Sequence, residues 1–164
     1  MLVVADTSPI NYLVLLEHTG VLPALYTRVL LPPAVVTELQ DPEAPEEVRA
    51  WVANLPAWCE VRRPDSLVET ETLAHLGAGE REAMLLAQEL RADFLLIDED
   101  DGRRAARSRA LTVTGTLGVL ERAAERGLLD LPRTLARLLT TTFRVRDDLI
   151  QTMLARDAAR KKPM

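Results

Sequence analysis

The stretch LVVADTSPI, residues 2–10, changes character abruptly after its fourth residue. Four apolar residues of the kind found in buried strands are followed at once by Asp6, and two residues later by the pair Ser8–Pro9. Serine before proline is typical of a helix start, so we predict a helix that is capped by Ser8 and ends at Gly20. Because Ser8 can supply this cap, Asp6 is not needed for it, and its place directly after a strand requires another explanation.

Short apolar strands and helices continue to alternate along the chain outward from this stretch. Further strands are predicted at residues 28–32, 59–63, 93–98 and 111–115. Helices are predicted at residues 8–20, 21–26, 33–40, 45–55, 77–92, 101–110, 116–127, 131–142 and 146–162. Continuous apolar strands separated by helices favour an α/β fold in which helices cover both faces of a central parallel sheet. In such a sheet, ligands bind at the carboxyl ends of the strands.

Length and composition are those of an ordinary globular protein. The 164 residues are 48% hydrophobic and 27% charged, which suits a single domain over residues 1–164, with 131–164 as a C-terminal helical extension. No apolar run approaches the roughly 20 residues that cross a bilayer, and no basic leader precedes the first strand. Cys59 is the only cysteine, which excludes an intrachain disulfide and a multi-cysteine zinc site. We therefore expect a cytoplasmic protein that does not enter membranes.

The charges are distributed unevenly along the chain. The net charge is −5, yet residues 33–100 carry 16 acids against 5 arginines, whereas residues 103–164 carry 14 basic residues against 6 acids. Such asymmetry is found where a cation-binding region lies beside a surface that binds a polyanion. Solvated helix faces produce the same pattern, and charge alone favours that plainer interpretation.

Carboxylates occur at the positions where a parallel sheet binds ligands. Asp6 follows the first strand, and the acidic run Asp98–Asp101 follows the apolar residues of another. Further acids on the predicted helices are Glu38, Glu80 and Glu82. Each has a plain explanation by itself, since acids are common in turns and in first helical turns. Together they would repel one another unless a divalent cation lay between them, and Mg²⁺ and Mn²⁺ prefer such oxygen ligands.

The sequence lacks the residues that other common binding and catalytic sites require. The sequence contains no phosphate-binding P-loop, and its only lysines are Lys161 and Lys162. The motif GAGERE at 77–82 has the wrong spacing for a dinucleotide-binding loop, and no strand is predicted before it. Two isolated histidines, His18 and His75, are too few for a zinc site or a catalytic triad. The carboxylates therefore remain as the chemistry to explain.

Five motifs in order resemble the PIN domain, and within it the VapC-like and uncharacterised bacterial and archaeal branch. They are VVADTSPI at 3–10, TEL at 37–39, GEREAMLLA at 79–87, LLIDEDDGRRAA at 95–106 and TVTGTLGVL at 112–120. The resemblance covers about residues 1 to 130 and implies a Rossmann-like α/β/α sandwich with a central parallel sheet. It also implies an acidic site that binds Mg²⁺ or Mn²⁺ and cuts RNA.

The resemblance also assigns roles to particular residues. By position, the catalytic and metal-binding acids are Asp6, Glu38, Glu80 and Asp98, with Glu82, Glu99 and Asp100 as alternatives because the register of the last two acids is ambiguous. Ser8 and Thr116 are the supporting hydroxyls. Arg103, Arg104 and Arg107 are candidates for phosphate contacts with RNA, although a solvated helix face explains them equally well. Glutamate in place of the family's usual aspartate at the third position leaves the competence of the site open.

Partners follow from the family alone. A VapC-like protein would be the toxin of a toxin–antitoxin pair, with a small antitoxin protein and a homodimeric assembly. The alternative function is a non-catalytic PIN-like module that binds RNA or a protein without cutting it. Binding of metal by Asp6 and at least two other acids would distinguish the enzyme from the binding module.

Overall fold

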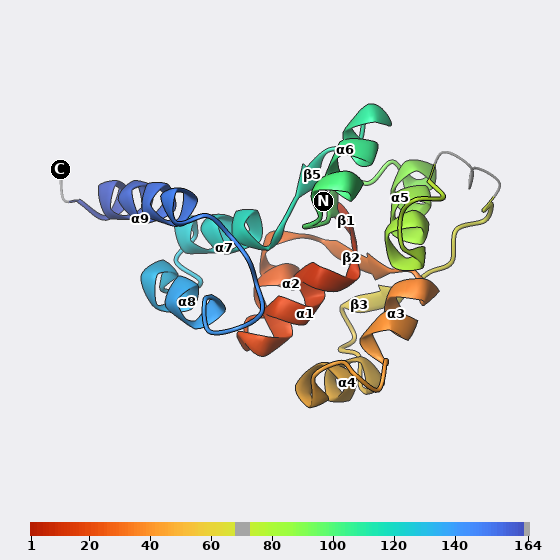
Figure 1. Cartoon of the computed structure of the whole chain (residues 1–164), viewed down its shortest axis with the longest axis horizontal. Helices are drawn as coiled ribbons and strands as arrows, with labels where there is room; N and C mark the ends of the chain where they lie inside the picture. Colours follow the sequence, from red (N-terminus) through yellow and green to blue (C-terminus); the bar gives the residue numbers. More distant parts are fainter. Residues whose placement is uncertain (68–72, 163–164) are drawn as a thin grey trace. The chain divides into compact units, whose positions relative to one another are not determined.

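The first strand of the chain lies in the middle of the sheet. The computed structural model describes residues 1–67 and 73–162, and these form a five-stranded sheet in the order β3-β2-β1-β4-β5 (Figure 1). Its strands are β1 (Leu2–Ala5), β2 (Arg28–Leu31), β3 (Cys59–Val61), β4 (Phe94–Leu96) and β5 (Val113–Thr114). Every neighbouring pair is parallel. The predicted α/β fold with a central parallel sheet is therefore confirmed.

The strand order reverses between β1 and β4. The chain runs from β1 outward to β2 and β3, then returns to the other side of β1 to form β4 and β5. Ala5 at the end of β1 is in register with Leu96 at the end of β4. The backbone N–H of Asp6 continues this pairing, since it donates to the carbonyl oxygen of Leu96 at 2.9 Å. A reversal of this kind opens a crevice at the carboxyl ends of the two central strands, where α/β proteins bind ligands.

Helices connect and cover the strands. They are α1 (Thr7–Leu15), α2 (Val21–Leu25), α3 (Pro33–Leu39), α4 (Glu46–Ala53), α5 (Ala78–Leu90), α6 (Asp100–Ser108), α7 (Thr116–Glu125), α8 (Leu131–Leu138) and α9 (Asp147–Lys161). The chain divides into two compact units, Met1–Thr116 and Leu117–Met164. The sheet and the acids singled out above belong to the first unit. In the second, α8 packs against α9, and Arg156 donates two hydrogen bonds to Glu121, at 2.8 and 2.9 Å.

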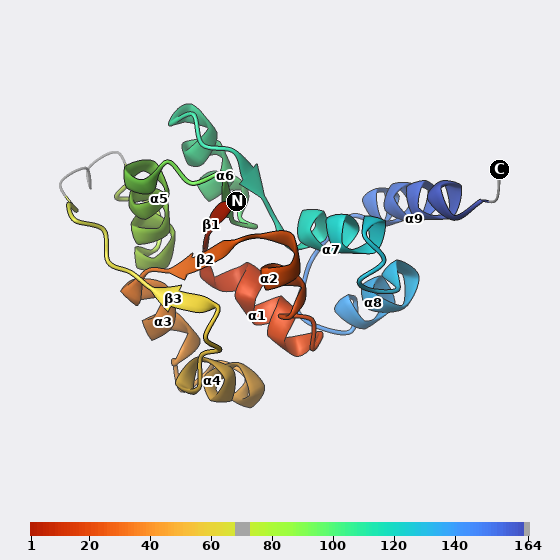
Figure 2. The same cartoon turned by 180° about the vertical axis from the view of Figure 1, so that it is seen from behind.

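The core of the first unit lies between the central strands and α5. Val3, Val4 and Ala5 of β1 are fully buried, as are Met84 and Leu86 of α5. Helix α5 packs on β1 and β4 and also against α3. Both views show α5 and α3 as neighbours (Figures 1 and 2). Burial of each such side chain contributes about 1.5–3 kcal/mol, which holds α5 and its acids firmly against the sheet. No helix in the described ranges is long and apolar enough to span a membrane.

The first helix differs from its prediction at both ends. It begins at Thr7, and the N-cap position belongs to Asp6, so the prediction that Ser8 caps the helix is wrong. It ends at Leu15 rather than at Gly20, because Glu17 adopts a left-handed conformation with φ 60°. The N–H of His18 then donates to the carbonyl of Leu13 at 2.9 Å, which closes the helix as in a Schellman motif.

Candidate metal centre

Asp6 places a buried carboxylate at the carboxyl end of β1. The residue is only 4% exposed. It occupies the N-cap position of α1, yet its side chain makes no capping hydrogen bond. Its Oδ1 atom is buried and finds no hydrogen-bond partner among the described residues. A buried carboxylate oxygen without a partner is costly, which makes this atom a candidate to bind a ligand.

The electrostatic surroundings of Asp6 are unfavourable for a negative charge. Burial raises the pKa of its carboxyl to about 7, only partly opposed by the backbone N–H of Thr7. The negative charges of Glu80, Glu38 and Asp98 raise this pKa as well. The structure thus brings four of the predicted acids into electrostatic contact. A divalent cation would reverse this balance, because it favours the ionised form of each.

Glu80 lies in the first turn of α5 and contributes the second unpartnered oxygen. Its Oε1 accepts a hydrogen bond from the backbone N–H of Gly77 at 3.3 Å, which caps the start of the helix. Its Oε2 is buried and has no hydrogen-bond partner in the described part of the chain. Burial raises the pKa of Glu80, and the charges of Glu99, Glu38 and Asp101 add to this, while the Gly77 N–H lowers it. One oxygen therefore serves the helix and the other is directed elsewhere.

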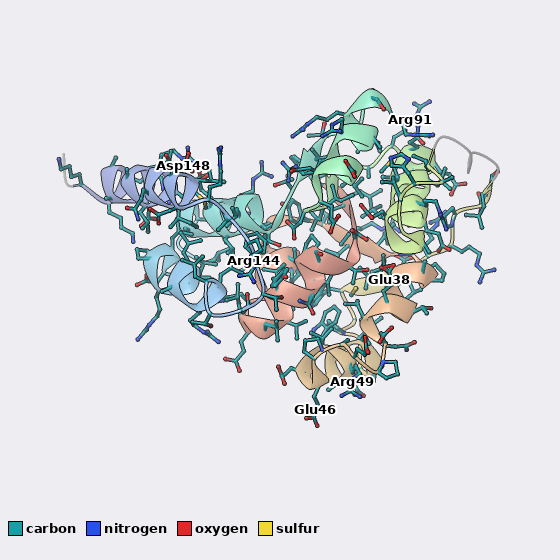
Figure 3. The ribbon with its side chains drawn as sticks, in the orientation of Figure 1. Glu38, Glu46, Arg49, Arg91, Arg144 and Asp148 are labelled. Atoms are coloured by element: carbon teal, nitrogen blue, oxygen red, sulfur yellow. The ribbon has the colours of Figure 1, made fainter. Side chains whose placement is uncertain are left out.

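Glu38 reaches the site from α3, where this helix meets α5 (Figure 3). The hydroxyl of Thr7 donates to its Oε1 atom at 3.2 Å. Sequence reasoning did not single out Thr7, because it named Ser8 as the supporting hydroxyl of this segment. Thr7 is a second candidate for a supporting hydroxyl, because it lies next to Asp6 and its hydroxyl reaches Glu38 on α3.

Asp98 is held by Thr116 just beyond β4. The backbone N–H of Thr116 donates to Oδ1 and its hydroxyl donates to Oδ2, both at 2.7 Å. Thr116, which the sequence predicts as a supporting hydroxyl, is fully buried. Burial raises the pKa of Asp98, while the two hydrogen bonds from Thr116 and the charge of Arg103 lower it. These bonds fix the orientation of the carboxylate and leave each oxygen a second lone pair for a cation.

The three alternative acids lie differently. Glu82 accepts a hydrogen bond from the backbone N–H of Ala34 at 3.0 Å, at the start of α3. Glu99 is the N-cap residue of α6, and Asp100 is the first residue of that helix; both are exposed. None of the three is among the charges that raise the pKa of Asp6. We therefore propose Glu80 and Asp98 as the third and fourth acids.

The predicted phosphate-binding arginines occupy one helix but have different surroundings. Arg103 donates to the backbone carbonyl of Ile97 at 3.1 Å and lies beside Asp98. Arg104 is exposed and pairs with Asp101 at 3.6 Å. Arg107 is exposed in the last turn of α6. Arg104 and Arg107 thus lie on the solvent-exposed part of α6, and Arg103 lies next to the acids.

Glycines lie against three of the four acids. A Cβ atom on Gly79 would collide with Oε2 of Glu38, and one on Gly102 would collide with Oε2 of Glu80. A Cβ atom on Gly115 would lie 2.6 Å from Oδ1 of Asp98. Glycine inside a helix is unfavourable, so Gly102 within α6 is a sequence signal that another group packs closely against this helix. The motifs that resemble the family do not reveal this contact.

These residues fit a divalent cation by their chemistry. The donors are carboxylate oxygens, two of them are buried without partners among the described residues, and glycines lie against the carboxylates of Glu38, Glu80 and Asp98. Within residues 1–67 and 73–162, however, no group of three histidine, cysteine or acidic side chains is already spaced to hold an ion.

We expect the substitution Gly102→Ala to weaken Mn²⁺ binding about tenfold, as is usual when a group that supports a metal ligand is disturbed. The new methyl group would displace Oε2 of Glu80 and press on Cδ1 of Ile97, which lies 2.5 Å from its position. Overpacking costs about 1–3 kcal/mol, and the better helix propensity of alanine offsets about 1 kcal/mol of it. Calorimetric titration with Mn²⁺ measures the effect.

The matched control is Gly20→Ala, because nothing lies within 4 Å of a Cβ atom at Gly20 and its φ of −62° suits alanine. Gly20→Ala should bind Mn²⁺ as the wild type does. Equal affinity of Gly102→Ala and the wild type would show that Gly102 does not shape the site.

The chain combines a parallel α/β sheet with one buried acid, Asp6, and three less buried acids that act on it electrostatically, and its strand order reverses between β1 and β4. The model of the DUF3368 family, described as a PIN domain, matches residues 2–158. The chain therefore belongs to the PIN-domain family and is a PIN-type, nuclease-like module.

Among solved structures, the chain is similar to a PilT N-terminus domain protein, SSO1118, from the archaeon Sulfolobus solfataricus P2. The two are 16% identical with a TM-score of 0.48, and the match covers 89% of this chain and 100% of the other. No curated protein matches the chain.

Proposed function

We propose that this PIN domain is a Mg²⁺- or Mn²⁺-dependent endoribonuclease. The observation that carries the proposal is a pair of buried oxygens, Oδ1 of Asp6 and Oε2 of Glu80, that have no hydrogen-bond partner in the part of the chain that the structure describes. Asp6, Glu38, Glu80 and Asp98 would hold the cation. When bound, it supplies positive charge that lowers the pKa of a water molecule and stabilises the leaving oxygen of a phosphodiester.

Other side chains would orient the acids, exclude water and bind the RNA. Thr7 and Thr116 orient the carboxylates of Glu38 and Asp98 by hydrogen bonds. Burial of Asp6 excludes water from its oxygens and strengthens its electrostatic interactions. Arg104 and Arg107 on the exposed part of α6 would contact the phosphates of RNA, since guanidinium groups bind phosphate oxygens in two-pronged geometry.

Removal of the metal tests the proposal directly. We expect the purified protein to cut single-stranded RNA in the presence of Mn²⁺ or Mg²⁺ and to stop when EDTA is added. The variant Glu43→Gln, which changes an exposed acid on the loop after α3, should cut as the wild type does. RNA that stays intact with Mn²⁺, or cleavage that continues in EDTA, would contradict a metal-dependent ribonuclease.

A non-catalytic PIN-like module that binds RNA or protein is the second candidate. One observation favours it: no three acids in the described ranges are already spaced for an ion. A crystal soaked in Mn²⁺ separates the two candidates, because an enzyme should show the ion bound to Asp6 and at least two other acids. RNA binding without metal and without cleavage would favour the module.

The biological setting that we propose is a toxin–antitoxin pair. The family model spans both compact units of the chain, which supports their acting together as one PIN-like domain with 131–164 as a helical extension. Expression of a toxin should arrest growth, and co-expression of a small antitoxin encoded beside it should relieve the arrest. The active form would be a cytoplasmic homodimer, which sedimentation of the purified protein measures.

A further inference from the structure

Glu82 lies two residues after Glu80 on α5 and contacts a different part of the protein. Its Oε1 atom accepts a hydrogen bond at 3.0 Å from the backbone N–H of Ala34, the second residue of α3. Successive helical residues are about 100° apart, so Glu80 and Glu82 lie about 160° apart around the helix axis, on nearly opposite sides. One glutamate is therefore directed to the acids and the other to α3.

The start of α3 has a particular need for this carboxylate. The N-cap residue is Pro32, which has no side-chain capping bond, and neither Pro32 nor Pro33 has an N–H group. The N–H of Val35 is satisfied by the carbonyl of Pro32 at 3.1 Å. Ala34 carries the remaining N–H of the first turn, and Glu82 satisfies it. A negative charge is also favoured at the N-terminus of a helix.

Helices α3 and α5 contact each other at two places along their length, at Ala34 with Glu82 and at Glu38 with Gly79. Ala34 and Glu38 are four residues apart on α3, and Gly79 and Glu82 are three apart on α5, so each pair lies on one helix face. Ala34 meets Glu82, and the carboxylate of Glu38 lies so close to Gly79 that a Cβ atom there would displace it. The first contact anchors the helix one turn away from the second.

We propose that Glu82 is a positioning residue, which fixes α3 on α5 and thereby places the carboxylate of Glu38 beside Glu80 and Asp6. Glu82 is not a metal ligand in this assignment. The inference rests on the proposed metal centre, because Glu38 is positioned for that centre. In this assignment, Glu82 needs an oxygen that accepts the N–H of Ala34, but it does not need a negative charge.

Two substitutions separate positioning from ligation. Glu82→Gln keeps an acceptor oxygen for the Ala34 N–H and should bind Mn²⁺ within about twofold of the wild type, whereas Glu82→Ala should bind it about tenfold more weakly. Glu80→Gln, which alters a proposed ligand, should lose more affinity than either. Amide hydrogen exchange supplies a readout that is independent of metal: exchange at Ala34 should be at least about tenfold faster in Glu82→Ala and unchanged in Glu82→Gln.

Glu89→Ala is the matched control for a merely structural loss. Glu89 also lies on α5, and its carboxylate accepts from the backbone N–H of Asp65 at 2.8 and 3.1 Å. Its removal deletes the same kind of bond at another place. It should lower the melting temperature without changing either Mn²⁺ affinity or the exchange rate at Ala34.

Three outcomes would overturn the assignment. If Glu82→Gln loses Mn²⁺ as Glu80→Gln does, Glu82 is a ligand. If Glu82→Ala binds Mn²⁺ like the wild type, the bond to Ala34 does not place Glu38. If exchange at Ala34 is unchanged in Glu82→Ala, the bond itself is absent. A wild type that binds no Mn²⁺ would refute the metal centre instead, and exchange at Ala34 would then still decide whether Glu82 fixes α3.

Discussion

Replacing Asp6 by asparagine is expected to abolish metal-dependent RNA cleavage, with a loss of at least about a hundredfold. Even residues that only support a metal ligand typically contribute 10–100-fold to affinity or activity, and Asp6 is proposed as a ligand itself. Asparagine has nearly the same shape, so the substitution removes charge without creating a cavity. The initial rate of RNA cleavage at saturating Mn²⁺ measures the effect.

The position of Asp6 explains why this loss should exceed that of any other single acid. Its carboxylate is 4% exposed, and the charges of Glu80, Glu38 and Asp98 all act on it. It is thus the acid that couples to the other three. Asp65→Asn, an exposed position on the loop after β3, should cleave normally. Equal cleavage by Asp6→Asn and the wild type would show that the site has been assigned to the wrong residues.

The same substitution is expected to stabilise the metal-free protein at neutral and alkaline pH. Burial raises the pKa of Asp6 from 3.8 to about 7. Because the folded-state pKa is raised, the folded protein retains a proton that the unfolded chain has lost between these values, and stability falls as the pH rises through this window. At about 1.36 kcal/mol per pH unit, the full penalty above pH 7 is on the order of 4 kcal/mol.

Urea unfolding in EDTA at several pH values tests this expectation. The unfolding free energies of Asp6→Asn and the wild type should be similar near pH 4, and the variant should become the more stable protein as the pH approaches 8. Glu80 and Asp98 also have raised pKa values, so they add a pH dependence of the same sign to both proteins. The difference between the proteins reports Asp6 together with its coupling to the other acids. A difference that does not change with pH would contradict the burial of Asp6 as an unpartnered acid.

Added metal should reverse the order of stability. A ligand present at a hundred times its dissociation constant stabilises the folded state by about 2.7 kcal/mol, and only a protein that binds it gains this stability. Mn²⁺ should therefore stabilise the wild type and leave Asp6→Asn nearly unchanged. Opposite effects on activity and on metal-free stability are typical of a residue kept for function rather than for folding.

Much of the fold could be predicted from local patterns. The buried strands are short apolar runs, such as LVVA in β1, and they alternate with helices whose apolar faces recur at helical spacing. Both patterns follow from which side chains must leave water, and this depends little on distant residues. The C-terminal end of α1 could not be predicted in this way, because Glu17 adopts the left-handed conformation that glycine usually adopts where a helix ends.

The sequence alone predicted the candidate acids, but it did not predict which of them lie together in the folded protein. Asp6 and Asp98 follow strands, and the rule that ligands bind at the carboxyl ends of parallel strands was enough to select them. The choice between Glu80 and Glu82 was different, because both lie in the first turns of the same helix and carry the same chemistry. The apolar face of that helix predicts which side is buried, but it does not predict which of the two glutamates meets the other acids and which meets α3.

The amino-acid sequence therefore established the strand–helix alternation, the central parallel sheet and the set of acids that follow its strands. Packing of α5 between α3 and the central strands distinguishes the two glutamates: Oε2 of Glu80 is buried with no partner among the described residues, and Glu82 accepts the N–H of Ala34. The physical reason is the range of the forces. Burial of apolar runs is encoded locally, whereas the direction of a carboxylate depends on neighbours that the chain brings together only when it folds.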